Sequence, residues 1–104
     1  MDIAIKTADQ LAHRAAEAAR LLKLLANERR LRVLCELASA GEVAVGELAR
    51  SVGLSQSALS QHLALMREDG LVGFRREGQT IYYRIADRNA ERLLDTLRAI
   101  FCPS

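Results

Sequence analysis

Apolar residues follow two different periods along this chain. In five stretches they return every three or four positions, and in one stretch between residues 71 and 85 they return at every second position. The first period is that of an α-helix with one buried face, and the second is that of a β-strand. The pattern therefore predicts a mainly α-helical fold with one β-hairpin, in the order α-α-α-α-β-β-α.

The expected outer helices carry strong apolar faces. A first helix is expected over residues 7–25, with one side formed by Ala8, Leu11, Ala15, Ala18, Leu22 and Leu25. Asn27 is suited to cap a second helix, whose inner positions include Leu31, Leu34, Cys35 and Ala38. Asp87 is suited to cap a last helix, whose apolar face holds Leu93, Leu94, Leu97, Ile100 and Phe101. Because no later element covers this last face, we expect it to pack on another element or on another subunit.

Two short helices are expected between these outer elements. The first spans residues 45–51 and ends at Gly53, because glycine readily takes the positive φ of a helix C-terminus. Ser55 can cap the second helix, and Gly70 lies where that helix should end, so it is expected over about residues 56–69. Two helical patterns joined by so short a turn predict a helix-turn-helix.

The second of these helices has one packing face and one free face. Leu59, Leu63 and Met66 fall together, with His62 at their flank, and Ser57, Ser60, Gln61 and Ala64 fall on the opposite side. The side chains of the free face are short, can form hydrogen bonds and include no carboxylate. The helix backbone could therefore approach the floor of a DNA major groove closely. Gln can pair with an adenine edge, and Ser can contact bases or phosphates. The alternative is an ordinary solvated helix face.

The alternating stretch predicts a β-hairpin directly after this helix. The strands are expected over residues 71–76 and 79–85, and Glu77-Gly78 marks the turn. Arg75, Arg76, Gln79 and Thr80 would then lie near the tip. A basic β-tip after a recognition helix is the wing of a winged helix-turn-helix and can meet phosphates or the minor groove. The alternative is an exposed hairpin with ordinary surface arginines.

Composition limits the class of protein. The chain has 104 residues and a formal net charge of +2, which alone would not suggest nucleic acid. The argument for DNA rests on the wing, where one acidic residue, Glu77, accompanies three basic residues, Arg75, Arg76 and Arg84. No apolar run reaches the length of a membrane span, and the first ten residues lack a signal pattern, so we expect one domain over residues 1–104 in the cytoplasm, with no membrane partner.

The sequence resembles the ArsR/SmtB family of small winged-helix repressors. The resemblance covers nearly the whole chain and is carried by GLSQSALSQHLALMREDGLV, followed by RREGQTIYYRI. It implies a homodimer, formed through the first and last helices, that binds a palindromic operator in double-stranded DNA and releases it when an inducer is sensed. The candidate DNA contacts are Gln56, Ser57, Ser60, Gln61, His62, Arg75, Arg76, Gln79 and Thr80. One departure is Ala44, which stands where a capping Ser or Thr would suit the helix at Val45.

A metal inducer is not supported by the count of ligands. Cys35 is the only sulfur in the second helix, and the last helix contains no histidine. A zinc-type site needs about four clustered nitrogen, sulfur or oxygen ligands. We therefore expect no metal and no cofactor.

The two cysteines remain as candidate sensors. A structural disulfide between Cys35 and Cys102 is not expected in a cytosolic protein, whereas a reversible one is allowed. One cysteine in the second helix and one at the end of the last helix resemble the BigR/SqrR-type subgroup, which implies a dithiol that senses reactive sulfur species or oxidants. The alternative is two inert thiols in a repressor with another inducer.

Two other classes compete with the repressor. A dithiol oxidoreductase would need a Cys-x-x-Cys pair in a thioredoxin-like frame, and the sequence has neither, so no enzyme is expected. A winged-helix interaction module without DNA binding would tend to carry apolar or acidic residues on the outer face of the helix. Ser57, Ser60 and Gln61 are instead polar and uncharged, which favours DNA.

Overall fold

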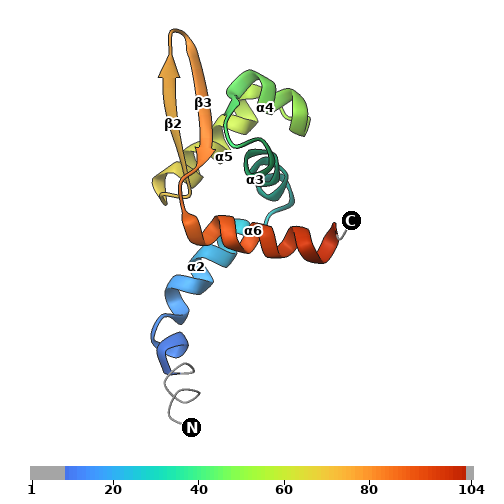
Figure 1. Ribbon diagram of the computed structural model, residues 1–104. Coiled ribbons are helices and arrows are strands. Elements are labelled where there is room, and N and C mark those ends of the chain that lie inside the picture. Colours follow the sequence, from blue (N-terminus) through green and yellow to red (C-terminus); the bar gives the residue numbers. More distant parts are fainter. Residues whose placement is uncertain (1–8, 103–104) are drawn as a thin grey trace.

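The computed structural model of this chain describes residues 9–102 and has one short sheet among helices (Figure 1). The elements are α2 (Ala15–Leu25), α3 (Glu28–Ala40), β1 (Val43–Ala44), α4 (Val45–Val52), α5 (Gln56–Glu68), β2 (Val72–Glu77), β3 (Thr80–Ile85) and α6 (Arg88–Phe101). Residues 9–13 are also helical. The hairpin β2–β3 projects from one end of the molecule, and α2 extends at the opposite end (Figure 1).

Helix α3 is the centre of the packing, because it contacts α2, α4, α6 and β3. Fully buried leucines from several elements meet around it, among them Leu34, Leu48, Leu59 and Leu94. Burying a side chain of this size stabilises a fold by about 1.5 to 3 kcal/mol relative to leaving it exposed. One core thus joins α3, α5 and α6. Of the expected inner positions of α3, Leu34 is fully buried, whereas Leu31, Cys35 and Ala38 are only partly buried against the core. The sequence analysis did not include Val33 and Leu37, which are also buried.

The local signals that bound the helices are confirmed. The side chain of Asn27 accepts a hydrogen bond from the Arg30 backbone N–H, and that of Asp87 accepts from the N–H groups of Asn89 and Ala90. Gly53 ends α4 with φ of 70°. Helix α4 begins at Ala44 without a side-chain cap, as its sequence indicated.

The prediction of one helix over residues 7–25 is wrong at Arg14. A turn at Arg14 separates the helical residues 9–13 from α2, and the Arg14 N–H lies 3.1 Å from the carbonyl oxygens of both Gln10 and Leu11. The period of apolar positions continues through this turn, so periodicity could not reveal it. Residues 7 and 8, with which the prediction began, lie outside the described residues.

The sheet has three antiparallel strands in the order β1-β3-β2, whereas the sequence predicted two. Strand β1 pairs Val43 with Tyr83, and its two residues are too few to show an alternating pattern. The expected turn was wrong by one residue. Glu77 pairs with Thr80 and so belongs to β2, which leaves Gly78, with φ of 63°, and Gln79 as the two loop residues.

No helix among residues 9–102 is both long and apolar enough to cross a membrane.

Candidate nucleic-acid interface and cysteine pair

Helix α5 is anchored by its inner face and presents a polar outer face. The hydroxyl of Ser55 caps the helix by accepting a hydrogen bond from the Ala58 N–H at 3.1 Å. Leu59, Leu63 and Met66 are buried beneath it, as predicted. The side chains expected to read DNA on the outer face are all exposed: Gln56, Ser57, Ser60 and Gln61. The sequence therefore identified correctly which side of α5 is free.

A cleft of about 730 Å³ lies between α4, α5 and the hairpin and brings two parts of the candidate interface together. From α5 it is lined by Gln56 and Ser60, and from the tip of the hairpin by Gln79 and Thr80. Ser57, Gln61 and His62 do not line this cleft. The candidate interface thus consists of a cleft edge shared with the wing and, beside it, the exposed face around Gln61.

Arg67 is a residue of this cleft that the sequence analysis missed. Its Nη1 donates a hydrogen bond to the hydroxyl oxygen of Tyr83 at 3.1 Å, and its guanidinium carbon lies 5.1 Å from the centroid of the Phe74 ring. Arg67 follows Ser60 and Ala64 on the same side of α5, and this helical spacing is the signal that would have revealed it. No ion pair joins Arg67 to a carboxylate of the described residues.

Arg75 does not lie free at the wing tip, which corrects the charge count made from the sequence. Its guanidinium forms an ion pair with Glu42, with Nη2 at 2.9 Å from Oε1, and a longer contact of 3.4 Å with Glu77. Glu42 lies in the loop before β1, far from the wing in sequence, so a local count could not include it. The hydrogen bond from Arg75 lowers the pKa of the Glu42 carboxyl, which favours its charged form.

Arg76 is exposed and makes no ion pair with any described residue. It pairs with Ile81 one position from the end of the ladder, so its side chain leaves the hairpin on the face opposite to that of Arg75. Arg76 is therefore one cation of the predicted wing that remains available to a phosphate.

His62 differs from the other candidates on α5 because it is half-buried. Burial lowers the pKa of its imidazole, and the nearby charges of Arg30 and Arg29 lower it further. The partial burial and the lowered pKa support a packing role for a neutral ring more than a contact with phosphate.

The two cysteines are free thiols, one on α3 and one directly after α6. Cys35 is half-buried on α3, and Cys102 is exposed at the C-terminal end of α6. Burial raises the pKa of the Cys35 thiol, the positive charge of Arg98 partly offsets that rise, and Cys102 adds to it. Arg98 and Cys102 therefore lie within electrostatic range of the Cys35 thiol. Among the described residues no three His, Cys, Asp or Glu side chains are grouped as metal ligands would be.

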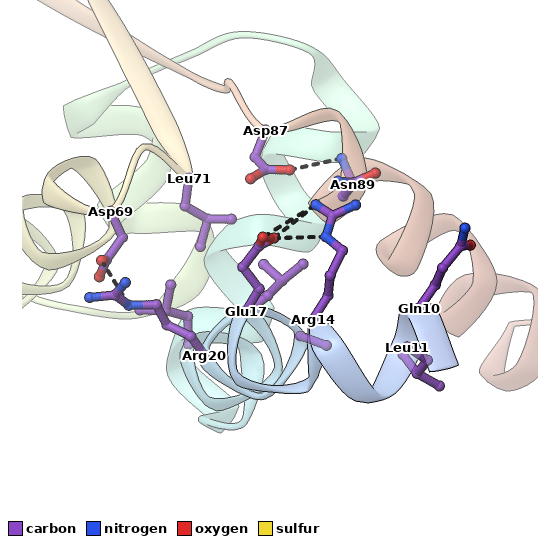
Figure 2. Close-up of a pocket in the computed structure, with 12 residues that line it drawn as sticks. Gln10, Leu11, Arg14, Glu17, Arg20, Asp69, Leu71, Asp87 and Asn89 are labelled. Atoms are coloured by element: carbon purple, nitrogen blue, oxygen red, sulfur yellow. Dashed lines mark hydrogen bonds and ion pairs between the residues drawn. The ribbon is translucent and has the colours of Figure 1, made fainter. Parts of the chain in front are cut away.

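A second cavity, of about 880 Å³, lies beside α2 (Figure 2). Its charged side chains are paired with one another: Arg14 lies 2.8 Å from Glu17, and Arg20 lies 3.8 Å from Asp69. The carboxylate of Asp87 is engaged at the start of α6 (Figure 2). None of the residues that the sequence singled out as a site lines this cavity.

These elements define a winged helix-turn-helix protein. They are a helix with a free polar face, the short helix before it and a β-hairpin with a basic edge. Residues 27–73 match the family described as bacterial regulatory protein, arsR family. The chain is 48% identical to the transcriptional activator HlyU of Vibrio cholerae over 84% of its own length and 80% of that protein. It belongs to the arsR family of bacterial regulatory proteins, which confirms the resemblance seen in the sequence.

Solved structures agree with this assignment. The transcriptional repressor BigR from Xylella fastidiosa superposes with a TM-score of 0.84 at 40% identity, covering 90% of this chain and 95% of that one. A structure described as reduced HlyU from Vibrio cholerae gives a TM-score of 0.84 at 45% identity, with coverage of 89% and 97%. The homodimeric winged helix-turn-helix DNA-binding domain Mb0332 from Mycobacterium bovis gives 0.74 at 38% identity, with coverage of 88% and 84%. Similarity to BigR and HlyU supports the BigR-type subgroup.

Proposed function

We propose that this protein is a homodimeric transcriptional repressor of the bacterial cytoplasm that binds a palindromic operator and is switched by Cys35 and Cys102. The observation that carries the DNA-binding part is the cleft that Ser60 of α5 lines together with Gln79 and Thr80 of the wing. Helix α5 would enter a major groove, and the wing would follow the adjacent backbone.

The outer face of α5 supports sequence reading. Gln61 can form two hydrogen bonds with an adenine edge, and Ser60 can contact a base or a phosphate. Arg76, which no described carboxylate neutralises, would pair with a phosphate and contribute affinity for any sequence.

Apolar residues left uncovered on α2 and α6 support the homodimer. Leu22 is 56% exposed, Ile100 is 61% exposed and Phe101 is 75% exposed within one chain. Large apolar side chains left exposed on the surface of one chain are typical of an interface between subunits. The matched domain Mb0332 is described as homodimeric, and a dimer would place two α5 helices on two half-sites. The expectation that α2 and α6 pack only within one monomer is less well supported, because they leave these residues exposed.

The position of the cysteines supports a switch by reactive sulfur. The exposed Cys102 thiolate would attack a polysulfide and take its terminal sulfur, and the rest of the polysulfide would leave with the electron pair. The Cys35 thiolate would then attack the Cys102 sulfur, so that a disulfide forms and hydrosulfide leaves. This bond would tie α3 to α6 within one subunit. The relative HlyU has been described in a form called reduced, which agrees with redox chemistry in that protein.

The DNA-binding part is tested by fluorescence anisotropy on a fragment of DNA from upstream of the protein's own gene. Gln61→Ala and Ser60→Ala should relax the preference at one position of each half-site. Arg76→Ala should weaken binding to every sequence and reduce the slope of log K against log salt by about one unit. Arg92→Ala is the matched control, because Arg92 is an exposed arginine on α6 without an ion pair to a described residue. Unchanged affinity and salt slope in Gln61→Ala and Arg76→Ala would overturn the proposed surface.

A further inference from the structure

A cluster of four side chains joins the wing to the loop that follows α3. The Nε of Arg75 lies 3.1 Å from Oε1 and 3.0 Å from Oε2 of Glu42, so the guanidinium engages both carboxylate oxygens. The Arg75 guanidinium carbon also lies 4.5 Å from the centroid of the Tyr82 ring, in a cation–π contact. Glu77 adds a weaker contact from the end of β2. Three partner side chains therefore fix the direction of a single arginine.

The carboxylate in this cluster is held on a rigid part of the chain. Glu42 follows Gly41, which ends α3 with φ of 86°, and it precedes Val43, which pairs with Tyr83 in the sheet. Arg75 comes from the hairpin, which projects away from the rest of the molecule (Figure 1). The ion pair thus ties a projecting hairpin to the end of the central helix.

The same contacts reduce the value of Arg75 as a partner for DNA. A phosphate at this guanidinium would have to compete with Glu42, whose carboxyl pKa the Arg75 hydrogen bond lowers and which therefore stays charged. Arg76 leaves the opposite face of β2 and makes no such pair with the described residues. Two neighbouring arginines of one strand therefore stand in different environments, although the sequence presents them as equivalent.

We infer that Arg75 is a positioning residue, which with Glu42 holds the wing in place for DNA and does not itself neutralise a phosphate. This inference rests on the proposed DNA-binding function. The side chains of Arg75 and Glu42 are 46% and 32% exposed, so solvent screens the pair and a modest effect on DNA affinity is expected.

The test uses the full-length reduced protein and four variants: Glu42→Gln, Arg75→Gln, Glu42→Gln/Arg75→Gln and Arg76→Gln. We expect Glu42→Gln and Arg75→Gln each to lower DNA affinity about two- to fivefold, with the double variant no weaker than the weaker single variant. The salt slope of Arg75→Gln should equal that of the parent protein, whereas Arg76→Gln should lose about one unit. In the free protein, amide hydrogen exchange in residues 72–85 should be faster in both single variants.

Three results would overturn the inference: a salt slope lowered by about one unit in Arg75→Gln, a rise in DNA affinity in Glu42→Gln, or additive losses in the double variant. Failure of the proposed function has a different signature, because Arg76→Gln would then also leave DNA affinity unchanged. In that case amide hydrogen exchange alone tests whether Glu42 and Arg75 hold the wing. Unchanged exchange in the hairpin of Glu42→Gln would show that they do not.

Discussion

The Nη1 of Arg67 donates a hydrogen bond to the hydroxyl oxygen of Tyr83 at 3.1 Å and so joins the end of α5 to the middle of β3. The Tyr83 ring packs 5.6 Å from that of Phe74, over which the same guanidinium lies. Because Tyr83 is only 6% exposed, this contact connects the surface of α5 to the core. Arg67 and Tyr83 both line the cleft between α4, α5 and the wing.

Replacing Tyr83 by Phe removes this hydrogen bond and keeps the buried ring. We expect the free energy of unfolding to fall by only about 0.5 kcal/mol, because water can solvate the exposed guanidinium of Arg67. Tyr83→Ala should cost about 3 to 5 kcal/mol, since it leaves a cavity under the hairpin. Urea denaturation of both variants measures the two values, and equal losses would mean that the hydroxyl, and not the ring, carries the contribution of Tyr83.

The reactivity of Cys35 should depend on Arg98. The charge of Arg98 offsets part of the rise that burial causes in the pKa of the Cys35 thiol, so Arg98→Gln should raise this pKa further. The rate of alkylation of Cys35 at a fixed pH near 8 should therefore fall. The measurement is the pH dependence of alkylation in a Cys102→Ser background. Arg92→Gln, on the same helix, is the control, and an equal effect of the two substitutions would show that Arg98 has no special role.

Stability should fall on mild acidification because of His62. Its pKa in the folded protein is lowered by burial and by Arg30 and Arg29, so below about pH 6.5 the unfolded chain binds a proton more readily than the folded one. The neutral ring contributes fully to the free energy of unfolding above pH 6.5. This contribution is lost as the pH falls through the pKa that His62 has in the folded protein. Thermal unfolding between about pH 7 and pH 5 measures it. His62→Gln should show a smaller decrease than the parent protein, and an identical pH dependence would contradict the assignment.

Zinc, cadmium, copper or arsenite should not release the protein from DNA. The chain offers one thiol on α3 and one directly after α6, and residues 9–102 contain no group of three potential metal ligands. Two thiols alone leave a tetrahedral coordination shell incomplete. Isothermal titration of the fully reduced protein tests this expectation. A tight, stoichiometric metal complex that releases DNA would refute it and would also remove the basis for the redox switch.

The sequence predicted the parts of this fold that depend on neighbouring residues. Asn27, Ser55 and Asp87 cap helices as expected, because a cap needs only a side-chain oxygen within three residues of its partner. The two faces of α5 were predicted for the same reason, since helical spacing alone separates Leu59 from Ser60. These short-range rules were enough to find the helix-turn-helix and the hairpin.

The missed features depend on contacts between residues far apart in the chain. Glu42 and Arg75 are 33 positions apart, and nothing near Arg75 in sequence indicates that its charge is already neutralised. Strand β1 has two residues and exists through its pairing with β3. Arg67 was overlooked because a single arginine near the end of a helix is most often a solvated residue. The candidate surface was therefore predicted in outline, whereas the different environments of its arginines required the structure.

The central claim is that a bond between Cys35 and Cys102 controls DNA binding. The most direct measurement is the affinity for a fragment of DNA from upstream of the protein's own gene, before and after treatment with polysulfide, for the parent protein, Cys35→Ser and Cys102→Ser. We predict that polysulfide weakens binding by the parent protein by about fivefold or more, the lower end of usual allosteric coupling. Mass spectrometry should find a link between Cys35 and Cys102, both single variants should keep their affinity, and a thiol reductant should restore binding. If both variants release DNA as the parent protein does, or if no link forms, the dithiol is not the switch.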